Sequence, residues 1–190
     1  ADREGPHGER FHYVSPVTDL MAWVMERATG TRYADLVSEF LLQPMGAERP
    51  GYVTVDRIGG ARAAGGMCLT ARDLARIGAL VADGGRRGDG RQVLPADWVA
   101  DIFDNGDVAA WKKGDFEENY PGADMHYRAK CYVLRGERPL LRGVGIHGQY
   151  LFADPVRGLS VAWFASEADA STAGYFKGRL ALVDKLRAAC

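Results

Sequence analysis

The stretch Gln149-Tyr-Leu-Phe-Ala-Asp-Pro-Val-Arg-Gly-Leu-Ser-Val-Ala-Trp-Phe-Ala165 decides the expected fold. Its two ends, residues 149–153 and 159–165, are short runs rich in β-branched and aromatic residues, which favour extended strands. Between them, Asp154-Pro-Val-Arg-Gly158 combines Pro with Gly, a composition typical of a tight turn. The sequence therefore predicts two antiparallel strands joined by a hairpin turn at residues 154–158.

A further strand is expected before this hairpin, and a helix after it. Residues 129–134 form another β-rich run, and Phe176, Leu180, Val183 and Leu186 recur at helical spacing. Apolar positions three or four residues apart mark one face of an amphipathic helix. We expect this C-terminal helix to lie on one face of an antiparallel sheet.

The chain before the sheet has a helical pattern. Ser15 is expected to cap the first helix with its side chain, and Pro16 fits the first turn. Thr70 and Asp73 have the spacing of a capping box, and Pro95 is a typical start of another helix. The predicted segments are helices at 15–29, from 31 to about 44, at 70–83 and from 95 onward, followed by a loop at 105–126.

Apolar faces on these helices predict which sides are buried. The first two helices are expected to pack together, and the fourth to turn its apolar side inward. The residues expected to face inward are Leu20, Met21, Val24, Met25 and Ala28 in the first helix, Leu36, Val37, Phe40 and Leu41 in the second, and Trp98, Val99, Ile102 and Phe103 in the fourth.

Length, charge and composition limit the class of protein. A chain of 190 residues has the length of one domain or a large piece of one. Its 24 Lys and Arg residues balance 25 Asp and Glu residues, so no broad positive field is available for nucleic acid. No apolar run approaches the roughly 20 residues that span a bilayer. We expect no nucleic-acid partner and no membrane span; the compartment is left open, with the cytoplasm slightly favoured.

Metal and disulfide chemistry have little support. The three cysteines are odd in number, widely separated and lack CxxC spacing, which argues against a disulfide framework or a zinc site. The four histidines show no ligand spacing on a shared helix face. We expect neither a metal nor a cofactor. The residues concerned are Cys68, Cys131, Cys190, His7, His12, His126 and His147.

The run Gly143-Val-Gly-Ile-His-Gly148 formally matches the GxGxxG dinucleotide fingerprint. That motif binds a pyrophosphate only where it opens a helix, and here the predicted strand 149–153 follows. The run is better interpreted as a glycine-rich edge that a ligand or another backbone approaches closely. His147 within it is either a hydrogen-bonding residue at a strand end or a catalytic base.

Three segments taken together carry a resemblance to one family. They are Phe11-His-Tyr-Val-Ser-Pro16 with the helix after it, Gly65-Gly-Met-Cys-Leu-Thr-Ala-Arg-Asp-Leu-Ala-Arg-Ile-Gly78 continuing to Trp98, and Gly143 to Asp154-Pro155. They resemble motifs of the serine β-lactamase-like hydrolases, which include penicillin-binding proteins, class C β-lactamases and esterases. The Tyr-x-Ser form and the Gly-Val-Gly-Ile run are most similar to the 6-aminohexanoate-dimer hydrolase branch.

The resemblance implies an α/β (α+β) fold, the C-terminal portion of the β-lactamase and DD-peptidase fold. Residues 1–190 would form one portion of that domain, with a helical and loop part at about 11–127 and strands with a closing helix at about 128–190. The family's nucleophile lies in a Ser-x-x-Lys motif, and none of the five serines here has Lys three residues later. We therefore expect the N-terminal part of the fold to be a missing partner.

The resemblance also assigns roles to residues of this chain. Tyr13 would carry protons during acyl transfer, and the amide of Ile146 would contribute half of an oxyanion hole. A free tyrosine has a pKa of about 10, so this role needs the cation that the family's lysine supplies. Ser15 would hydrogen-bond within the site, and His147 is also expected to contact substrate. From their residue type alone, Tyr52, Trp111 and Tyr150 either line the substrate cleft or pack in the core.

The implied activity is cleavage of a small-molecule amide or ester through an acyl-enzyme. Gly143 stands where family β-lactamases have a cation for the substrate carboxylate, so β-lactam hydrolysis itself is not expected. The alternative is a catalytically inactive relative that keeps the cleft as a binding or interaction module. A Ser-x-x-Lys motif upstream would favour the enzyme, and its loss the module.

Overall fold

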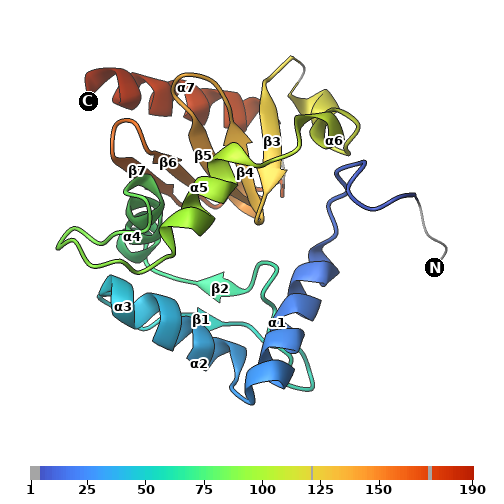
Figure 1. Ribbon diagram of the computed structural model, residues 1–190, viewed down its shortest axis with the longest axis vertical. Helices are drawn as coiled ribbons and strands as arrows, with labels where there is room; N and C mark the ends of the chain where they lie inside the picture. The colour runs from blue at the N-terminus through green and yellow to red at the C-terminus, as the bar shows by residue number, and fades with distance from the viewer. Residues whose placement is uncertain (1–4, 121, 171–172) are drawn as a thin grey trace.

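The computed structural model describes residues 5–120, 122–170 and 173–190, and its centre is a five-stranded antiparallel sheet (Figure 1). The strands follow one another in sheet order, so each pairs with its neighbours in sequence. The predicted hairpin is confirmed, with Ala153 opposite Ser160. The strands are β3 (Met125–Arg128), β4 (Cys131–Leu134), β5 (Leu140–Gly145), β6 (Gln149–Asp154) and β7 (Leu159–Trp163).

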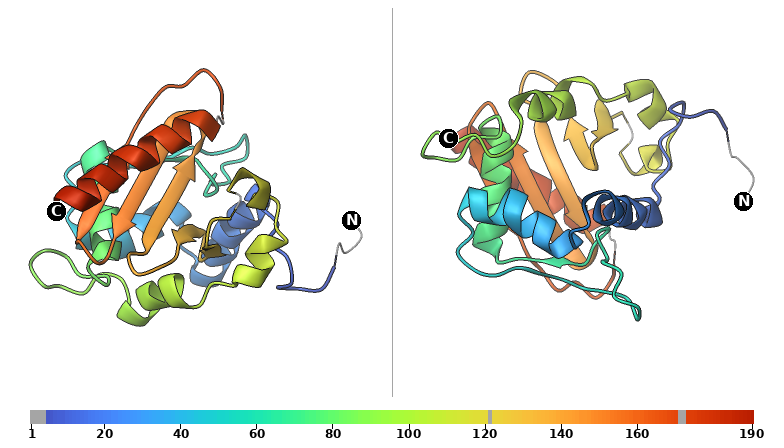
Figure 2. Two further views of the ribbon diagram at one scale, coloured as in Figure 1. Left: turned by 90° about the horizontal axis from the view of Figure 1, so that it is seen from above. Right: turned by 60° about the horizontal axis from the view of Figure 1, so that its bottom comes forward.

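Helices cover both faces of this sheet (Figure 2). The C-terminal helix α7 (Ala173–Ala189) lies on one face, where Val183 packs with Phe152. Helices α4 (Ala71–Ala82) and α5 (Ala96–Asp104) cover the other, where Ile102 packs with Ala153. Because side chains alternate along a strand, successive residues of β6 enter the two different cores. The mixed α/β fold and the position of the closing helix are as predicted.

The remaining elements lie outside these layers, with α6 (Val108–Lys112) beside β3 and those of residues 15–68 together on the opposite side of the molecule (Figure 1). Two short strands pair with each other as a separate ribbon, with Tyr52 opposite Cys68. Gly46, in a left-handed conformation, ends the second helical run, and Pro44, at the expected end, lies inside it. The other elements are α1 (Ser15–Thr29), α2 (Tyr33–Val37), a π-helical turn (Ser38–Leu42), α3 (Gln43–Met45), β1 (Tyr52–Val53), β2 (Met67–Cys68) and a 3₁₀ turn (Glu117–Asn119).

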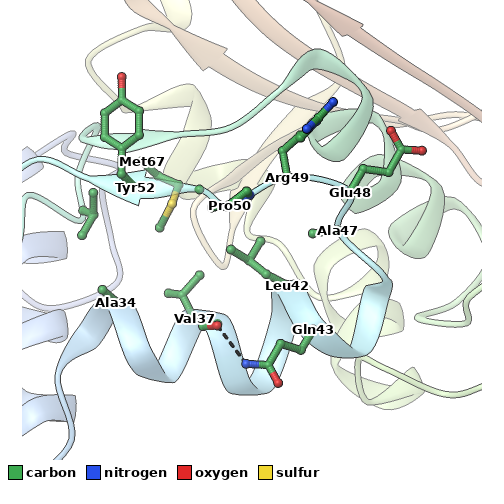
Figure 3. A pocket seen from close by; sticks show the side chains of 13 residues that line it. Ala34, Val37, Leu42, Gln43, Ala47, Glu48, Arg49, Pro50, Tyr52 and Met67 are labelled. Atoms are coloured by element: carbon green, nitrogen blue, oxygen red, sulfur yellow. Dashed lines mark hydrogen bonds between the residues drawn. The ribbon is translucent and has the colours of Figure 1, made fainter.

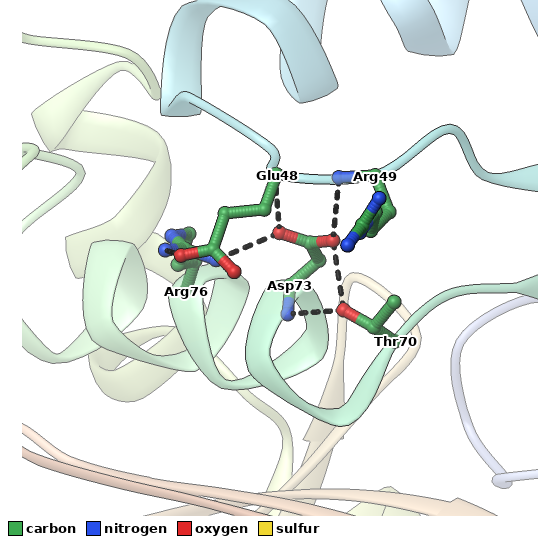
Figure 4. Close-up of polar contacts among 5 residues, drawn as sticks. All are labelled: Glu48, Arg49, Thr70, Asp73 and Arg76. Atoms are coloured by element: carbon green, nitrogen blue, oxygen red, sulfur yellow. Dashed lines mark hydrogen bonds and ion pairs between the residues drawn. The ribbon is translucent and has the colours of Figure 1, made fainter.

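Helix α4 begins at the capping box that the sequence predicts, and the box extends beyond the helix (Figure 4). The Thr70 hydroxyl oxygen accepts the Asp73 amide at 3.1 Å. The buried Asp73 carboxylate accepts the amides of Glu48 at 2.9 Å and Arg49 at 3.3 Å, and a guanidinium hydrogen bond from Arg76 at 2.8 Å. The cap therefore also holds the loop after α3 in place.

Several local expectations are wrong. Ser15 is the first residue of α1 and caps nothing with its side chain; Val14 precedes the helix. Trp98 is exposed, although Val99 and Ile102 are buried as expected. The segment 105–126, expected as loop, contains α6, a 3₁₀ turn and the start of β3. Helix α6 was missed because its five residues are too few to show a period.

A buried ion pair holds α7 against the end of the sheet. The Arg187 Nε donates to Asp154, which is fully buried in the hairpin turn, and another Arg187 nitrogen donates to the Arg138 carbonyl before β5. Asp154 also accepts the turn amides of Val156 at 2.9 Å and Arg157 at 3.1 Å. The Asp154 carboxylate thus holds the predicted turn and also binds α7.

Removing the cation of this pair should destabilise the fold strongly. Arg187→Met keeps an unbranched apolar stem and leaves Asp154 buried without its counter-charge, so we expect a loss of about 3–5 kcal/mol in the free energy of unfolding. The matched control is Arg135→Met, which breaks the exposed pair with Asp124 and should cost about 1 kcal/mol or less. Urea unfolding measures both, and equal losses would contradict the assignment.

Acid should weaken the fold through Asp73 and Asp154. The Glu48 amide is the main cause that lowers the pKa of Asp73. Burial alone would raise the pKa of Asp154, but Arg187 and the turn amides outweigh it, so this pKa is also lowered. Carboxylates with lowered pKa values stabilise the fold above the unfolded value of about 4 and lose that contribution as the pH falls below it. Urea unfolding from pH 7 to pH 3 should show this fall, and Asp73→Asn should make it shallower.

Candidate active site

The segment that carries Tyr13 lies against the loop after α6. The Phe11 amide donates to the Ala110 carbonyl at 2.9 Å, and the Asp115 amide donates back to the Phe11 carbonyl at 3.2 Å. The Phe11 ring packs on Trp111, with ring centroids 5.3 Å apart, and on Tyr127 of β3 at 4.6 Å. An aromatic cluster therefore joins the start of the chain to the edge strand of the sheet.

Tyr13 and Ser15 line one small hollow at the start of α1. Tyr13 is 39% exposed, and its ring packs on Phe116 at 5.5 Å and on Tyr127 at 6.3 Å. The hollow has a volume of about 110 Å³, and the β3–β4 hairpin contributes Tyr127 and Lys130 to its wall. The structure brings these two predicted site residues together in a place that a ligand can reach.

Ile146 lies in the turn that joins β5 to β6. Its side chain is 63% exposed, directly after the last residue of β5. His147 follows with φ of 56°, a left-handed conformation that is uncommon for a residue other than glycine. Gly148 is buried with φ of 86°, and a Cβ there would lie 2.8 Å from the Glu167 carboxyl carbon. The turn is therefore tight, and the segment after β7 packs closely against its backbone.

The segment after β7 supplies that external support. The His147 amide donates to the Ala170 carbonyl at 3.0 Å, and the Glu167 amide donates to the His147 carbonyl at 3.2 Å. The His147 ring nitrogen Nδ1 lies 2.9 Å from the Glu167 carbonyl oxygen. Glu167 in turn pairs with Arg179 of α7, and both side chains are nearly buried. His147 is thus a hydrogen-bonded residue at a strand end.

Tyr13 and Ile146 reach the same edge of the sheet. Strands β3 and β5 both run antiparallel to β4, so their C-terminal ends lie at one edge (Figure 1). Tyr127, next to the end of β3, contacts the Tyr13 ring, and Ile146 directly follows β5. The two strands are separated by one intervening strand, roughly 10 Å, and the register sets Tyr127 level with Arg142, four residues before Ile146. This topology places the two predicted catalytic groups on one side of the fold.

Other predicted substrate contacts lie elsewhere. Trp111 is 0% exposed and Tyr150 is 7% exposed, because α6 and β6 turn these rings into the core. The burial of both rings argues against the prediction that they contact substrate. Tyr52 is 67% exposed and lines a different hollow of about 420 Å³, between β1 and the helices 33–45 (Figure 3). This hollow and the one beside Tyr13 have no lining residue in common.

No sequence motif marks the two acidic residues that support the site. Asp115 and Glu167 lie in connecting segments without a motif, and they meet Tyr13 and His147 only in the folded chain. In the part of the chain that the structure describes, no group of three or more His, Cys, Asp or Glu side chains could hold a metal ion. No helix there is long and apolar enough to cross a bilayer.

The family model named Beta-lactamase matches residues 1–182 of this sequence. The chain therefore belongs to the β-lactamase family. It is 39% identical over 152 residues to the 6-aminohexanoate-dimer hydrolase of Paenarthrobacter ureafaciens. That match covers 80% of this chain and 38% of the relative, so the chain spans well under half of the relative's length.

Solved structures show the same fold. A Bacillus anthracis protein assigned as a 6-aminohexanoate-dimer hydrolase superposes with a TM-score of 0.81 at 27% identity, over 98% of this chain and 47% of that one. EstCE1, described as a hydrolase with promiscuous acyltransferase activity, gives 0.67 at 17% identity, over 88% and 54%. An octameric penicillin-binding protein homologue from Pyrococcus abyssi gives 0.64 at 17%, over 92% and 43%.

A side chain at Gly148 should disturb the turn that carries Ile146. Gly148→Ala places a Cβ against Glu167 and adds the strain of a left-handed backbone, so we expect a loss of about 2–4 kcal/mol in the free energy of unfolding. Gly90→Ala is the matched control, because Gly90 has φ of 87° with nothing within 4 Å of the added Cβ. It should cost about 1–2 kcal/mol. Equal losses in urea unfolding would show that Glu167 does not press on the turn.

Proposed function

We propose that this chain forms the acid/base and oxyanion part of a serine hydrolase that cleaves an amide or ester bond through an acyl-enzyme. The observation that carries the proposal is the placement of Tyr13 and the Ile146 turn at one edge of the sheet in a β-lactamase-family chain. The 39% identity to a 6-aminohexanoate-dimer hydrolase supports an amide among the substrates.

The chemistry divides between this chain and a segment that it does not contain. A serine hydroxyl would attack the carbonyl carbon while its proton passes to the Tyr13–lysine pair, and that proton would leave with the departing amine or alcohol. Water would then hydrolyse the acyl-enzyme by the same path in reverse. Two amides would hold the developing oxyanion, one of them from Ile146. None of the serines here is followed by Lys three residues later, so the nucleophile and the lysine must come from elsewhere.

The exposed apolar face of α1 is a surface against which that segment could pack. Ala22 is the buried residue of this helix, and the side expected to face the core is exposed instead. A helix that is apolar on several sides is normally buried in a larger core. Tyr13 lies two residues before this helix, and the superposition on the Bacillus anthracis protein uses only 47% of that chain. The exposed apolar residues are Val17, Leu20, Met21, Trp23, Val24 and Met25.

The chain by itself should have no serine-hydrolase activity. A fluorophosphonate probe reacts with an activated serine, and activation requires an adjacent base. We expect no stoichiometric adduct by mass spectrometry and no p-nitrophenyl ester hydrolysis above background. An adduct on any of the five serines would overturn the proposed division of the site.

Joining the chain to the missing segment should create activity that depends on Tyr13. The upstream part of the Paenarthrobacter ureafaciens relative, fused ahead of this chain, supplies the test protein. Tyr13→Phe removes the proton carrier and keeps the ring packing, so kcat should fall about 10²- to 10⁴-fold.

His147→Ala is the discriminating control for this experiment, because its ring is occupied by Glu167. It should retain more activity than Tyr13→Phe. If His147→Ala abolished turnover and Tyr13→Phe did not, the proton carrier would be the imidazole. A folded fusion without any activity would favour a binding module.

A further inference from the structure

Three donors from the segment before α1 converge on the carboxylate of Asp115. Arg10 Nη2 lies 2.9 Å from Oδ1, and His12 Nδ1 lies 2.7 Å from Oδ2. The Tyr13 amide donates to Oδ2 at 2.9 Å. This amide is the main cause that lowers the pKa of the Asp115 carboxyl. Asp115 lies in the loop after α6, 102 residues away in sequence, so this contact is a tertiary constraint.

The start of α1 has no comparable local support. No side chain caps this helix, although the sequence suggests Ser15 for that role. The support comes from Asp115, whose own amide also donates to the Phe11 carbonyl. The loop approaches closely, because a Cβ at Gly114 would lie 2.7 Å from the Phe11 Cβ. Backbone and carboxylate contacts together fix residues 10–13 on the surface of this loop.

We propose that Asp115 is the positioning residue for Tyr13. The carboxylate holds the Tyr13 backbone, so that the ring stays against Phe116 and Tyr127 and its hydroxyl keeps one position in the hollow beside Ser15. Proton transfer requires heavy atoms within about 2.6–3.2 Å, and a displacement of about 1 Å can reduce a rate 10²-fold. This inference rests on the proposed role of Tyr13, and Asp115 acts through Tyr13 without contact to substrate.

Hydrogen exchange on the chain as it stands tests the positioning without any activity. Asp115→Asn removes the charge that all three donors share, and its NH₂ group lies either against Arg10 or against both His12 and the Tyr13 amide. We expect the Tyr13 amide to exchange about 10- to 100-fold faster, while the amides of the paired strands β5 and β6 stay within about twofold. Asp124→Asn is the control, since Asp124 makes an exposed ion pair with Arg135, and it should change neither.

The sheet amides separate a local effect from unfolding. If Asp115→Asn loses protection throughout the sheet, Asp115→Glu is measured next, because it keeps the charge and moves the carboxylate by one methylene. In that variant the Tyr13 amide must exchange faster while the amides of β5 and β6 keep their protection. An unchanged Tyr13 amide in a folded Asp115→Asn or Asp115→Glu chain would overturn the proposal.

A double-mutant cycle in the active fusion protein tests the link to turnover. Asp115→Asn should lower kcat about 10- to 100-fold with KM within about twofold. Added to Tyr13→Phe, it should lower kcat by less than threefold more, because its effect passes through the missing hydroxyl. Additive losses would indicate a general structural role and contradict the proposal. A fusion without activity would count against the proposed function alone, since the exchange result does not depend on it.

Discussion

The pairing of β5 with β6 is the constraint on which the rest of the structure depends. These strands lie inside the sheet, and five residue pairs from Leu141 and Ala153 to Gly145 and Gln149 fix their register. A shift by one residue would exchange the two faces, and would move Phe152 from the α7 core to the α4 and α5 core. The same register fixes where the turn at Ile146 leaves the sheet, so core packing and the proposed oxyanion amide share one cause.

Much of this architecture follows from local sequence patterns. The hairpin at Asp154, the capping box at Thr70 and the closing helix are local patterns, and the sequence predicts each of them. Short elements such as α6 and β1 cannot be predicted in this way, because two to five residues show no reliable period. The inward face predicted for α1 is exposed, because a periodic pattern shows that a face is apolar and not what covers it.

The candidate site was predictable only in part. Motif resemblance pointed to Tyr13, Ser15 and Ile146; Tyr13 and Ser15 line one hollow, and Ile146 directly follows β5. Aromatic residues alone were a poor guide, since Trp111 fills the core. Asp115 and Glu167 could not be found from sequence, because their importance lies in contacts between loops and distant segments. Both halves of the proposed site are thus held by residues outside the motifs, one by the Asp115 carboxylate and the other by the Glu167 backbone.

The most direct test of the account is the rate of acylation at the serine of the Ser-x-x-Lys motif in the fusion protein. Quenched samples analysed by mass spectrometry report the acyl-enzyme before turnover. The account predicts rapid acylation of that serine, slowed at least about 10²-fold by Tyr13→Phe in a folded protein. An equal acylation rate with and without the Tyr13 hydroxyl would contradict the claim that this chain supplies the proton carrier.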